Sequence, residues 1–210
     1  MLEFVHNHGR EIVTLTAEHL WLVVVSMVLA VLAGVPLGIV LTRRPKWKAL
    51  ILGSTNVIQT IPSLALFGLL LPLPWLGVRA DRLTITALVL YALLPIVRNT
   101  FVGITGVDAP VRQAAAAMGM TSREMLWHIE LPLATPVILT GVRVATVITI
   151  GVATIAAAIG AGGLGEFIFR GLAMVDTHVI LAGAIPAALM ALIADFGLGL
   201  IQQVVQRRIH

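Results

Sequence analysis

The chain has no cysteine among its 210 residues, which excludes disulfide bonds and metal sites built on thiolates. Charged residues are scarce too: they make up 11% of the sequence, whereas 59% of the residues are hydrophobic. A soluble domain usually has about 25% charged and about 45–50% apolar residues. Together with a mean hydropathy of +1.01, this composition predicts an integral membrane protein.

Motifs for nucleotide binding and for intramembrane catalysis are also lacking. The sequence has no G-x-x-x-x-G-K-[ST] motif, and the glycine-rich run 160–165 lacks the lysine of a phosphate-binding loop. It has no H-E-x-x-H motif, and the serines of the apolar runs (Ser26, Ser54 and Ser63 among them) have no histidine near them in a span. An intramembrane enzyme is therefore the weaker interpretation, and a purely structural membrane protein is a third.

Five apolar runs predict an all-α membrane fold with about five transmembrane helices. About twenty residues suffice to cross a bilayer. The runs cover residues 22–41, about 50–71, 83–97, 133–159 and 179–205. A re-entrant or surface piece is expected between the second run and Asp81, because prolines interrupt that stretch.

The division of the chain follows from the same pattern. The polar and mixed residues 1–20 are predicted to be an extracytoplasmic N-terminal segment, and residues 21–210 a single transmembrane domain. His6 and His8 have no third metal ligand nearby, so no metal site is predicted.

Four polar side chains in the second run, Asn56, Gln59, Thr60 and Ser63, are spaced at i, i+3, i+4 and i+7, which is one face of a helix. A polar stripe at membrane depth needs protein or water beside it. The stripe either joins helices or, together with Tyr91, lines a translocation path, and the residues leave both interpretations open.

One base and one acid lie inside the apolar runs. Arg143 lies about ten residues into the fourth run, roughly 15 Å deep by helical rise, and Asp195 lies in the inner half of the fifth. A charge at such a depth needs a partner. The two side chains are therefore predicted to form an ion pair, the alternative being that each reaches the bilayer surface or a different partner.

The longest polar interruption covers residues 111–132. Its alanine-rich first part is predicted to form a helix that ends at Gly119. Thr121, with a glutamate three residues later, has the spacing of a capping box and predicts a second helix, which ends at Leu131-Pro132. This helix–turn–helix is expected to lie at the membrane surface and to dock into a groove on another protein. An interfacial helix without a partner is the alternative.

This stretch resembles the cytoplasmic coupling loop of ABC-importer permeases. The family pattern is Glu-Ala-Ala, three residues, Gly, nine residues, and Ile-x-Leu-Pro. The matching positions are Gln113, Ala114, Ala115, Gly119, Ile129, Leu131 and Pro132. Glutamine replaces the usual glutamate, so a salt bridge to the ATPase at that position is not implied. The resemblance implies that the loop 109–132 contacts a separate ATPase.

Residues 56–73, 91–100 and 151–172 are similar to permeases for quaternary-ammonium osmoprotectants such as glycine betaine, choline and carnitine. The resemblance implies a type I importer core like that of methionine permeases. It also implies a second permease subunit, identical or sister, a pair of cytoplasmic ATPases and an extracytoplasmic binding protein. ATP-Mg then binds the ATPases, and this chain needs no cofactor. A permease for methionine or another amino acid is the alternative.

With the coupling stretch in the cytoplasm, five spans place the N-terminus outside and the C-terminus inside a bacterial or archaeal cell membrane. Of the 14 Lys and Arg residues, four then lie outside, Arg143 lies in the membrane and nine lie inside, namely Arg43, Arg44, Lys46, Lys48, Arg98, Arg112, Arg123, Arg207 and Arg208. This distribution agrees with the positive-inside bias.

Overall fold

The structure is a computed structural model that describes the backbone of residues 2–77 and 79–209 and the side chains of residues 8–77 and 79–207. Within these residues the regular structure is helical, without strands, which confirms the predicted all-α class. The side chain of His6, considered above as a metal ligand, lies outside the described residues.

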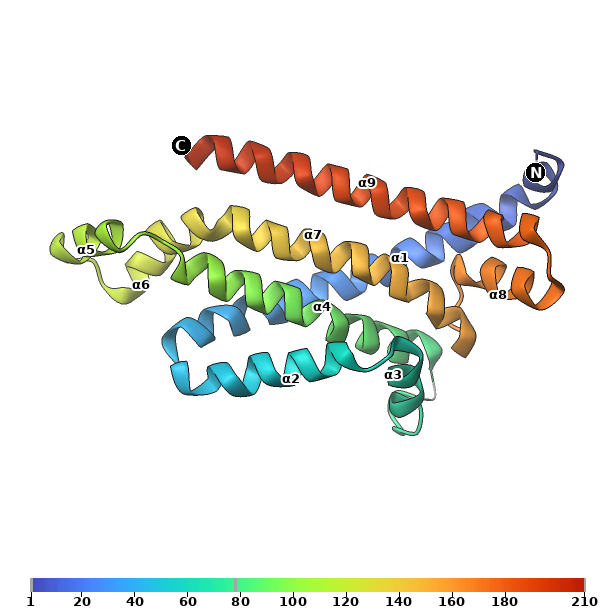
Figure 1. The fold of residues 1–210 in the computed structure, drawn as a ribbon, viewed down its shortest axis with the longest axis horizontal. Helices are drawn as coiled ribbons and strands as arrows, with labels where there is room; N and C mark the ends of the chain where they lie inside the picture. Colours follow the sequence, from blue (N-terminus) through green and yellow to red (C-terminus); the bar gives the residue numbers. More distant parts are fainter. Residues whose placement is uncertain (1, 78, 210) are drawn as a thin grey trace.

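Four long helices form the bundle (Figure 1). They are α1 (Leu2–Arg43), α4 (Ala80–Thr105), α7 (Leu131–Ile155) and α9 (Thr177–Ile209). The shorter elements are η1 (Pro45–Trp47), α2 (Lys48–Thr60), α3 (Ser63–Leu70), α5 (Ala109–Ala117), α6 (Ser122–Met125), η2 (Leu126–Glu130), η3 (Ala156–Ile159) and α8 (Gly165–Met174). In the described part of the chain, four helical segments are long and apolar enough to cross a membrane, or five if α2 and α3 count as one bent span.

Helix α4 lies at the centre of the bundle, packed against α1, α7 and α2. The main core joins Leu88 and Ile96 of α4 to Leu22 and Ala30 of α1 and to Ala145 of α7. Helix α9 covers α7 and α8 at one edge. Helices α5 and α6 form one end of the molecule, and α8 and the start of α1 lie at the other (Figure 1).

Two glycines let α1 approach α4 closely. A Cβ atom on Gly38 would lie 2.5 Å from the Cβ of Thr100, and one on Gly34 would lie 2.7 Å from Cγ2 of Ile96. Pro36, between the two glycines, does not interrupt the helix. Close packing, a common use of small residues in membrane helices, therefore explains these glycines.

Helix α1 runs without a break through the expected boundary between residues 20 and 21, so the first twenty residues are not a separate element. Leu15 packs into a cluster with Phe167 and Val179. His19 is fully buried, and its Nε2 lies 3.1 Å from the carbonyl oxygen of Ile150. Helices α8 and α9 thus cover the side of α1 that carries Leu15.

The second predicted span is not one straight helix. Helices α2 and α3 meet at an angle of 105°, and Ile61 between them is extended, with φ −68° and ψ 128°. Pro62 explains the break, because a proline has no N–H and disfavours helical backbone at the preceding residue. The hydroxyl of Tyr91 donates a hydrogen bond to the carbonyl oxygen of Ile61, which the break leaves free.

Helix α4 extends beyond the predicted span 83–97, up to Thr105. Arg98 and Asn99 lie within the helix, and the Asn99 amide donates to the carbonyl oxygen of Pro95 at 2.8 Å. The charge of Arg98 thus marks an exposed face of the helix and not its end.

Candidate functional site

The predicted coupling stretch forms a compact helix–turn–helix. Helix α5 ends at Ala117, and Gly119 follows two residues later with a φ of +82°. The Met120 N–H donates to the Ala115 carbonyl at 3.2 Å, and the Gly119 N–H donates to the Ala116 carbonyl at 3.0 Å. These two bonds form a Schellman motif, which requires a left-handed residue and therefore favours glycine. The predicted helix end at Gly119 is confirmed.

The second half of the stretch begins with the predicted capping box. The hydroxyl of Thr121 accepts from the N–H of Glu124 at 3.3 Å, and the Glu124 carboxylate accepts from the N–H of Thr121 at 2.8 Å. The helix does not end at Leu131-Pro132 as predicted. It continues through the π-helical turn η2 into α7, with the Leu131 N–H bonded to the Leu126 carbonyl. A wide π turn eases the clash that Pro132 would otherwise cause in the helix.

The stretch presents apolar side chains at the end of the molecule. Met118 is 74% exposed and Trp127 is 59% exposed. A hollow of about 270 Å³ between α5 and α6 is lined by Met118, Gly119, Met120, Glu124 and His128. Among the residues of the coupling pattern, Ala115 is buried, Ile129 and Leu131 are half-buried, and Gln113, Ala114, Gly119 and Pro132 are exposed. We call the exposed surface of residues 113–128 the docking surface.

An ion pair joins η2, which follows the docking surface in the chain, to α1. The guanidinium of Arg43, at the end of α1, donates to the carboxylate of Glu130 in η2 and lies 3.5 Å from the carbonyl oxygen of Ser122. Glu130 is buried, with 2% of its side chain exposed. The sequence pattern did not reveal this pair, because 87 residues separate the partners and Arg43 belongs to a basic cluster that indicated only the cytoplasmic side.

Arg143 and Asp195, the predicted intramembrane ion pair, lie together. Arg143 Nε and Nη2 donate to Asp195 Oδ1 and Oδ2 at 2.5 Å each, a bidentate geometry. Gly199 makes room for the guanidinium, since a Cβ atom there would lie 3.2 Å from Arg143 Nη1. The two side chains are 35% and 40% exposed in this single chain. The pair therefore lies between α7 and α9 at a surface, and not in the core.

The proposed polar stripe is divided by the bend between α2 and α3. Asn56, Gln59 and Thr60 belong to α2, whereas Ser63 begins α3, so the four do not share one helical face. The Thr60 hydroxyl bonds to the Val57 carbonyl in its own helix at 2.7 Å. Tyr91 is 6% exposed and supports the bend, a structural use that the sequence pattern did not reveal.

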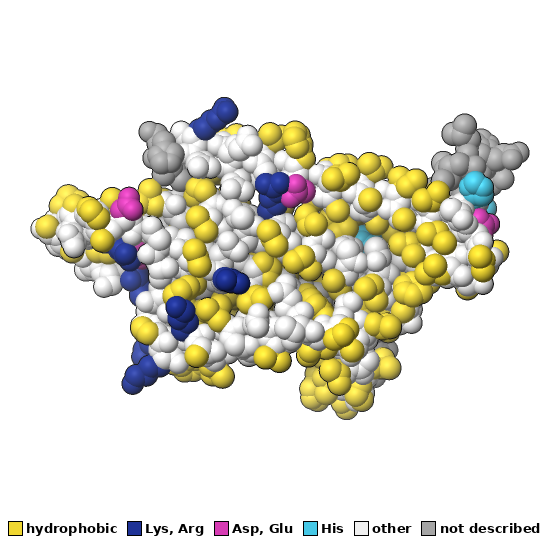
Figure 2. All heavy atoms as spheres, in the orientation of Figure 1, with side chains coloured by type: hydrophobic (Ala, Val, Ile, Leu, Met, Phe, Trp, Pro, Cys, Tyr) yellow, Lys and Arg dark blue, Asp and Glu magenta, His cyan; other side chains and the backbone are white. Residues whose placement is uncertain are grey.

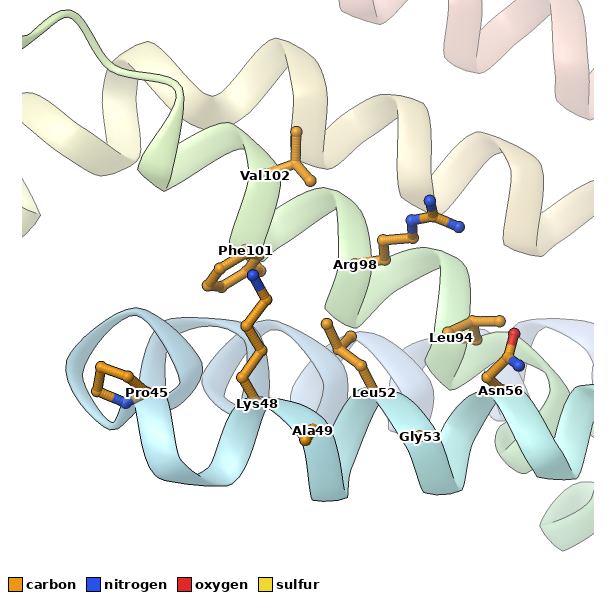
Figure 3. A pocket seen from close by; sticks show the side chains of 10 residues that line it. All are labelled: Pro45, Lys48, Ala49, Leu52, Gly53, Asn56, Leu94, Arg98, Phe101 and Val102. Atoms are coloured by element: carbon orange, nitrogen blue, oxygen red, sulfur yellow. The ribbon is translucent and has the colours of Figure 1, made fainter.

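A pocket of about 670 Å³ lies between α2 and α4 (Figure 3). It is lined by Pro45, Lys48, Ala49, Leu52, Gly53, Asn56, Leu94, Arg98, Phe101 and Val102. The Lys48 ammonium lies 4.6 Å from the centroid of the Phe101 ring, within cation–π distance. Asn56 is thus the one residue of the stripe that lines this pocket, and Lys48 and Arg98 are additional residues that the sequence analysis had assigned only to topology.

At the opposite end, the glycine-rich loop holds α1. The Gly163 N–H donates to the carboxylate of Glu18 at 3.1 Å, and a Cβ atom on Gly163 would lie 3.2 Å from Nδ1 of His19. Gly160, Gly162 and Gly163 all have positive φ angles, which explains the glycines without a phosphate ligand.

Residues 34–210 match the family described as the binding-protein-dependent transport system inner membrane component. The chain belongs to this family. It is 41% identical over 203 residues to the choline transport system permease protein OpuBB of Bacillus subtilis, an alignment that covers 97% of this chain and 92% of OpuBB. It is 40% identical over 203 residues to the glycine betaine/carnitine/choline transport system permease protein OpuCB of the same species, with the same coverage of both chains.

The fold is that of a solved ABC transporter subunit. A chain of the MetNI methionine ABC transporter, solved in inward-facing conformations, superimposes with a TM-score of 0.80 at 20% identity, covering 90% of this chain and 93% of that chain. The expected type I importer fold is thereby confirmed. As an inner membrane component of a transport system, the chain is a multi-pass permease subunit, and the described apolar helices agree with this assignment.

Proposed function

We propose that the chain is the permease subunit of an ATP-driven importer for osmoprotectants such as glycine betaine, choline or carnitine. The family supports a transport function, and the names of the relatives that align over 97% of this chain support the solute class. Methionine, the solute of the MetNI transporter, is the weaker candidate, because 20% identity relates the two proteins only in fold.

The docking surface is the observation that carries the proposal. Met118 and Trp127 expose apolar area at one end of the bundle, beside polar groups of α5 and α6. A separate ATPase dimer, which binds ATP-Mg, docks there through Gln113, Ala114, Gly119 and their neighbours. In this proposal, ATP binding and hydrolysis belong to the partner ATPase.

The orientation follows from this contact. Lys and Arg side chains gather over the half of the molecule that carries α5 and α6 (Figure 2), which suits a cytoplasmic face under the positive-inside rule. The C-terminus is then cytoplasmic, and residues near the start of α1 are extracytoplasmic, where a binding protein delivers the solute.

A second permease subunit, identical or sister, completes the pore. The exposed part of the Arg143–Asp195 pair supports this assembly, because an ion pair near the middle of two spans is costly against lipid. Helix α2, in which only Thr55 is buried, also leaves most of its surface free for a partner or for the solute path.

Transport then proceeds by alternating access. Closure of the ATPase dimer moves the docking surfaces of the two permeases together, and α7 follows because it is continuous with η2 and α6. Nucleotide shifts the equilibrium between inward and outward states only through its different affinity for the two.

Uptake of labelled glycine betaine, choline and methionine after osmotic upshift tests the proposal, in cells with and without this chain. Cells without this chain are expected to lose uptake of glycine betaine or choline and to keep uptake of methionine. If only methionine uptake is lost, the solute is methionine and not an osmoprotectant. If uptake of all three solutes continues, the osmoprotectant function is refuted. Co-purification of an ATPase with the chain, abolished by deleting residues 113–128, tests the docking surface separately.

A further inference from the structure

The pocket between α2 and α4 carries positive charge and no negative charge. Lys48 and Arg98 line it, and none of its ten lining residues is Asp or Glu. The ion pairs formed within the described part of the chain do not include either cation. Lys48 and Arg98 thus contribute two cations to the pocket lining, without an acidic side chain beside them in that lining.

A solute with only a positive charge does not suit these surroundings. A quaternary ammonium favours the face of an aromatic ring, but Phe101 is the only aromatic residue that lines the pocket, and the Lys48 ammonium already lies 4.6 Å from its ring centroid. Figure 3 shows Lys48 extended from α2 toward Phe101 on α4. Like charges in this space repel, and the low polarity of Leu52, Leu94 and Val102 strengthens the repulsion.

We infer that this pocket is a subsite for the carboxylate of the solute, so that the permease favours zwitterionic osmoprotectants over choline. The inference rests on the proposed function and concerns the cytoplasmic part of the proposed solute path. Guanidinium and ammonium groups donate charge-assisted hydrogen bonds to a carboxylate, and the amide of Asn56 supplies a neutral donor. The volume of about 670 Å³ lies in the usual range for small-molecule sites. Glycine betaine and carnitine carry a carboxylate, and choline does not.

The phosphate of an anionic lipid offers the same chemistry, because it too presents negatively charged oxygens to Lys48 and Arg98. Lys48 begins α2, and Arg98 lies seven residues before the end of α4, so a lipid headgroup at the cytoplasmic surface has access to the same two cations. A lipid would act equally on all solutes, whereas a carboxylate subsite distinguishes between them.

The test is uptake by the complete transporter, with its ATPase and binding protein, reconstituted in vesicles. Labelled glycine betaine and labelled choline are compared for the wild type, Lys48→Gln and Arg98→Gln. The ratio of glycine betaine to choline uptake is expected to fall about tenfold in each variant, as for the loss of one charge-assisted hydrogen bond. Arg44→Gln, an exposed basic residue outside the pocket lining, is the control and keeps the wild-type ratio. An unchanged ratio in both pocket variants overturns the inference, as does a wild type that takes up choline alone.

The same assay in vesicles of phosphatidylcholine, with and without phosphatidylglycerol, separates the two sources of the anion. If the pocket is a carboxylate subsite, Lys48→Gln and Arg98→Gln lower the ratio of glycine betaine to choline uptake equally in both kinds of vesicle. If the pocket variants lose uptake of both solutes equally, and only in vesicles that contain phosphatidylglycerol, the pocket is a lipid site and the inference is overturned.

Labelling of Lys48 by an amine-reactive reagent gives a readout that does not depend on transport. Glycine betaine is expected to protect Lys48 in the purified complex, as measured by mass spectrometry, and choline is not. If the wild type takes up neither solute, the proposed function fails while this measurement still decides the subsite. Equal labelling with and without glycine betaine refutes it.

Discussion

Glu130 is the only acidic side chain that is fully buried among the described residues, with 2% of its side chain exposed. Arg43 balances its charge from the end of α1 and is 39% exposed. A buried carboxylate that loses its partner is costly, because desolvation is then uncompensated. The position of η2, and with it the docking surface, therefore depends on α1.

Replacing Arg43 by Gln is expected to lower the free energy of unfolding by about 2 kcal/mol, less than for a fully buried pair because Arg43 is partly in solvent. Thermal unfolding of the purified chain in detergent measures the change. Arg44→Gln, one residue further on, serves as the control. The double variant Arg43→Gln with Glu130→Gln is expected to regain stability. A double variant no more stable than Arg43→Gln would show that the buried charge is not the cause.

The Arg143–Asp195 pair allows a second comparison at the level of single residues. Asp195→Asn leaves Arg143 without an anion at membrane depth, and we expect a lower yield of folded protein. The double variant Arg143→Leu with Asp195→Leu removes both charges and is expected to give a higher yield than Asp195→Asn. Size-exclusion chromatography of detergent extracts measures the yields. Equal yields for the two variants would mean that the unpaired charge is not what destabilises the protein.

At the scale of helices, prolines had two different effects. Pro62 breaks the second span, and the hydrogen bond from Tyr91 to Ile61 supports the resulting bend of 105°. Pro36 leaves α1 continuous, where the neighbouring glycines pack against α4. A proline in a membrane segment therefore permits a bend, and the neighbouring helix decides whether one forms.

The contact between α1 and α4 depends on a missing side chain at Gly38. Gly38→Ala is expected to destabilise the protein by about 2 kcal/mol, because the added Cβ would lie 2.5 Å from the Thr100 Cβ and 3.0 Å from the Val97 carbonyl oxygen. Gly151→Ala is the matched control, since nothing lies within 4 Å of the Cβ added there. Higher helix propensity should make this control neutral or stabilising. Thermal unfolding compares the two, and equal effects would argue against close packing at Gly38.

At the scale of the whole molecule, the proposed role of the docking surface is to transmit changes between an ATPase and the spans. Gly119 offers a test that separates the fold from this contact. A Cβ atom on Gly119 meets nothing within 4 Å of the chain, although its φ of +82° strains any other residue. Alanine and tryptophan there share the same backbone strain, and only tryptophan adds bulk toward a partner.

We expect Gly119→Trp to abolish uptake while ATP hydrolysis continues. Gly119→Ala is expected to lower uptake by at most about 30-fold, since strain of this kind costs roughly 1–2 kcal/mol. Uptake and phosphate release in reconstituted vesicles measure both quantities. Normal uptake by Gly119→Trp would place the ATPase contact elsewhere.

The sequence by itself determined the membrane class, the number of apolar runs and the local signals of the coupling stretch. A long apolar run with few charges favours a lipid environment, whichever helices pack beside it. The Schellman motif at Gly119 and the capping box at Thr121 involve residues only a few positions apart, so spacing alone predicts them. The family pattern was visible for the same reason, because its positions lie within a short stretch.

Arg143 and Asp195 could be paired from the sequence because they are the one base and the one acid inside the apolar runs. For the other distant contacts, only the tertiary structure decided which residues meet. The hydrogen bond at the Pro62 bend joins Tyr91 to Ile61, which are 30 residues apart in the sequence. The partners of the Arg43–Glu130 pair are 87 residues apart. The pocket combines Lys48 with Arg98 because α2 lies against α4. Such contacts depend on how whole helices pack, and the local sequence carries no record of the partner that each side chain reaches.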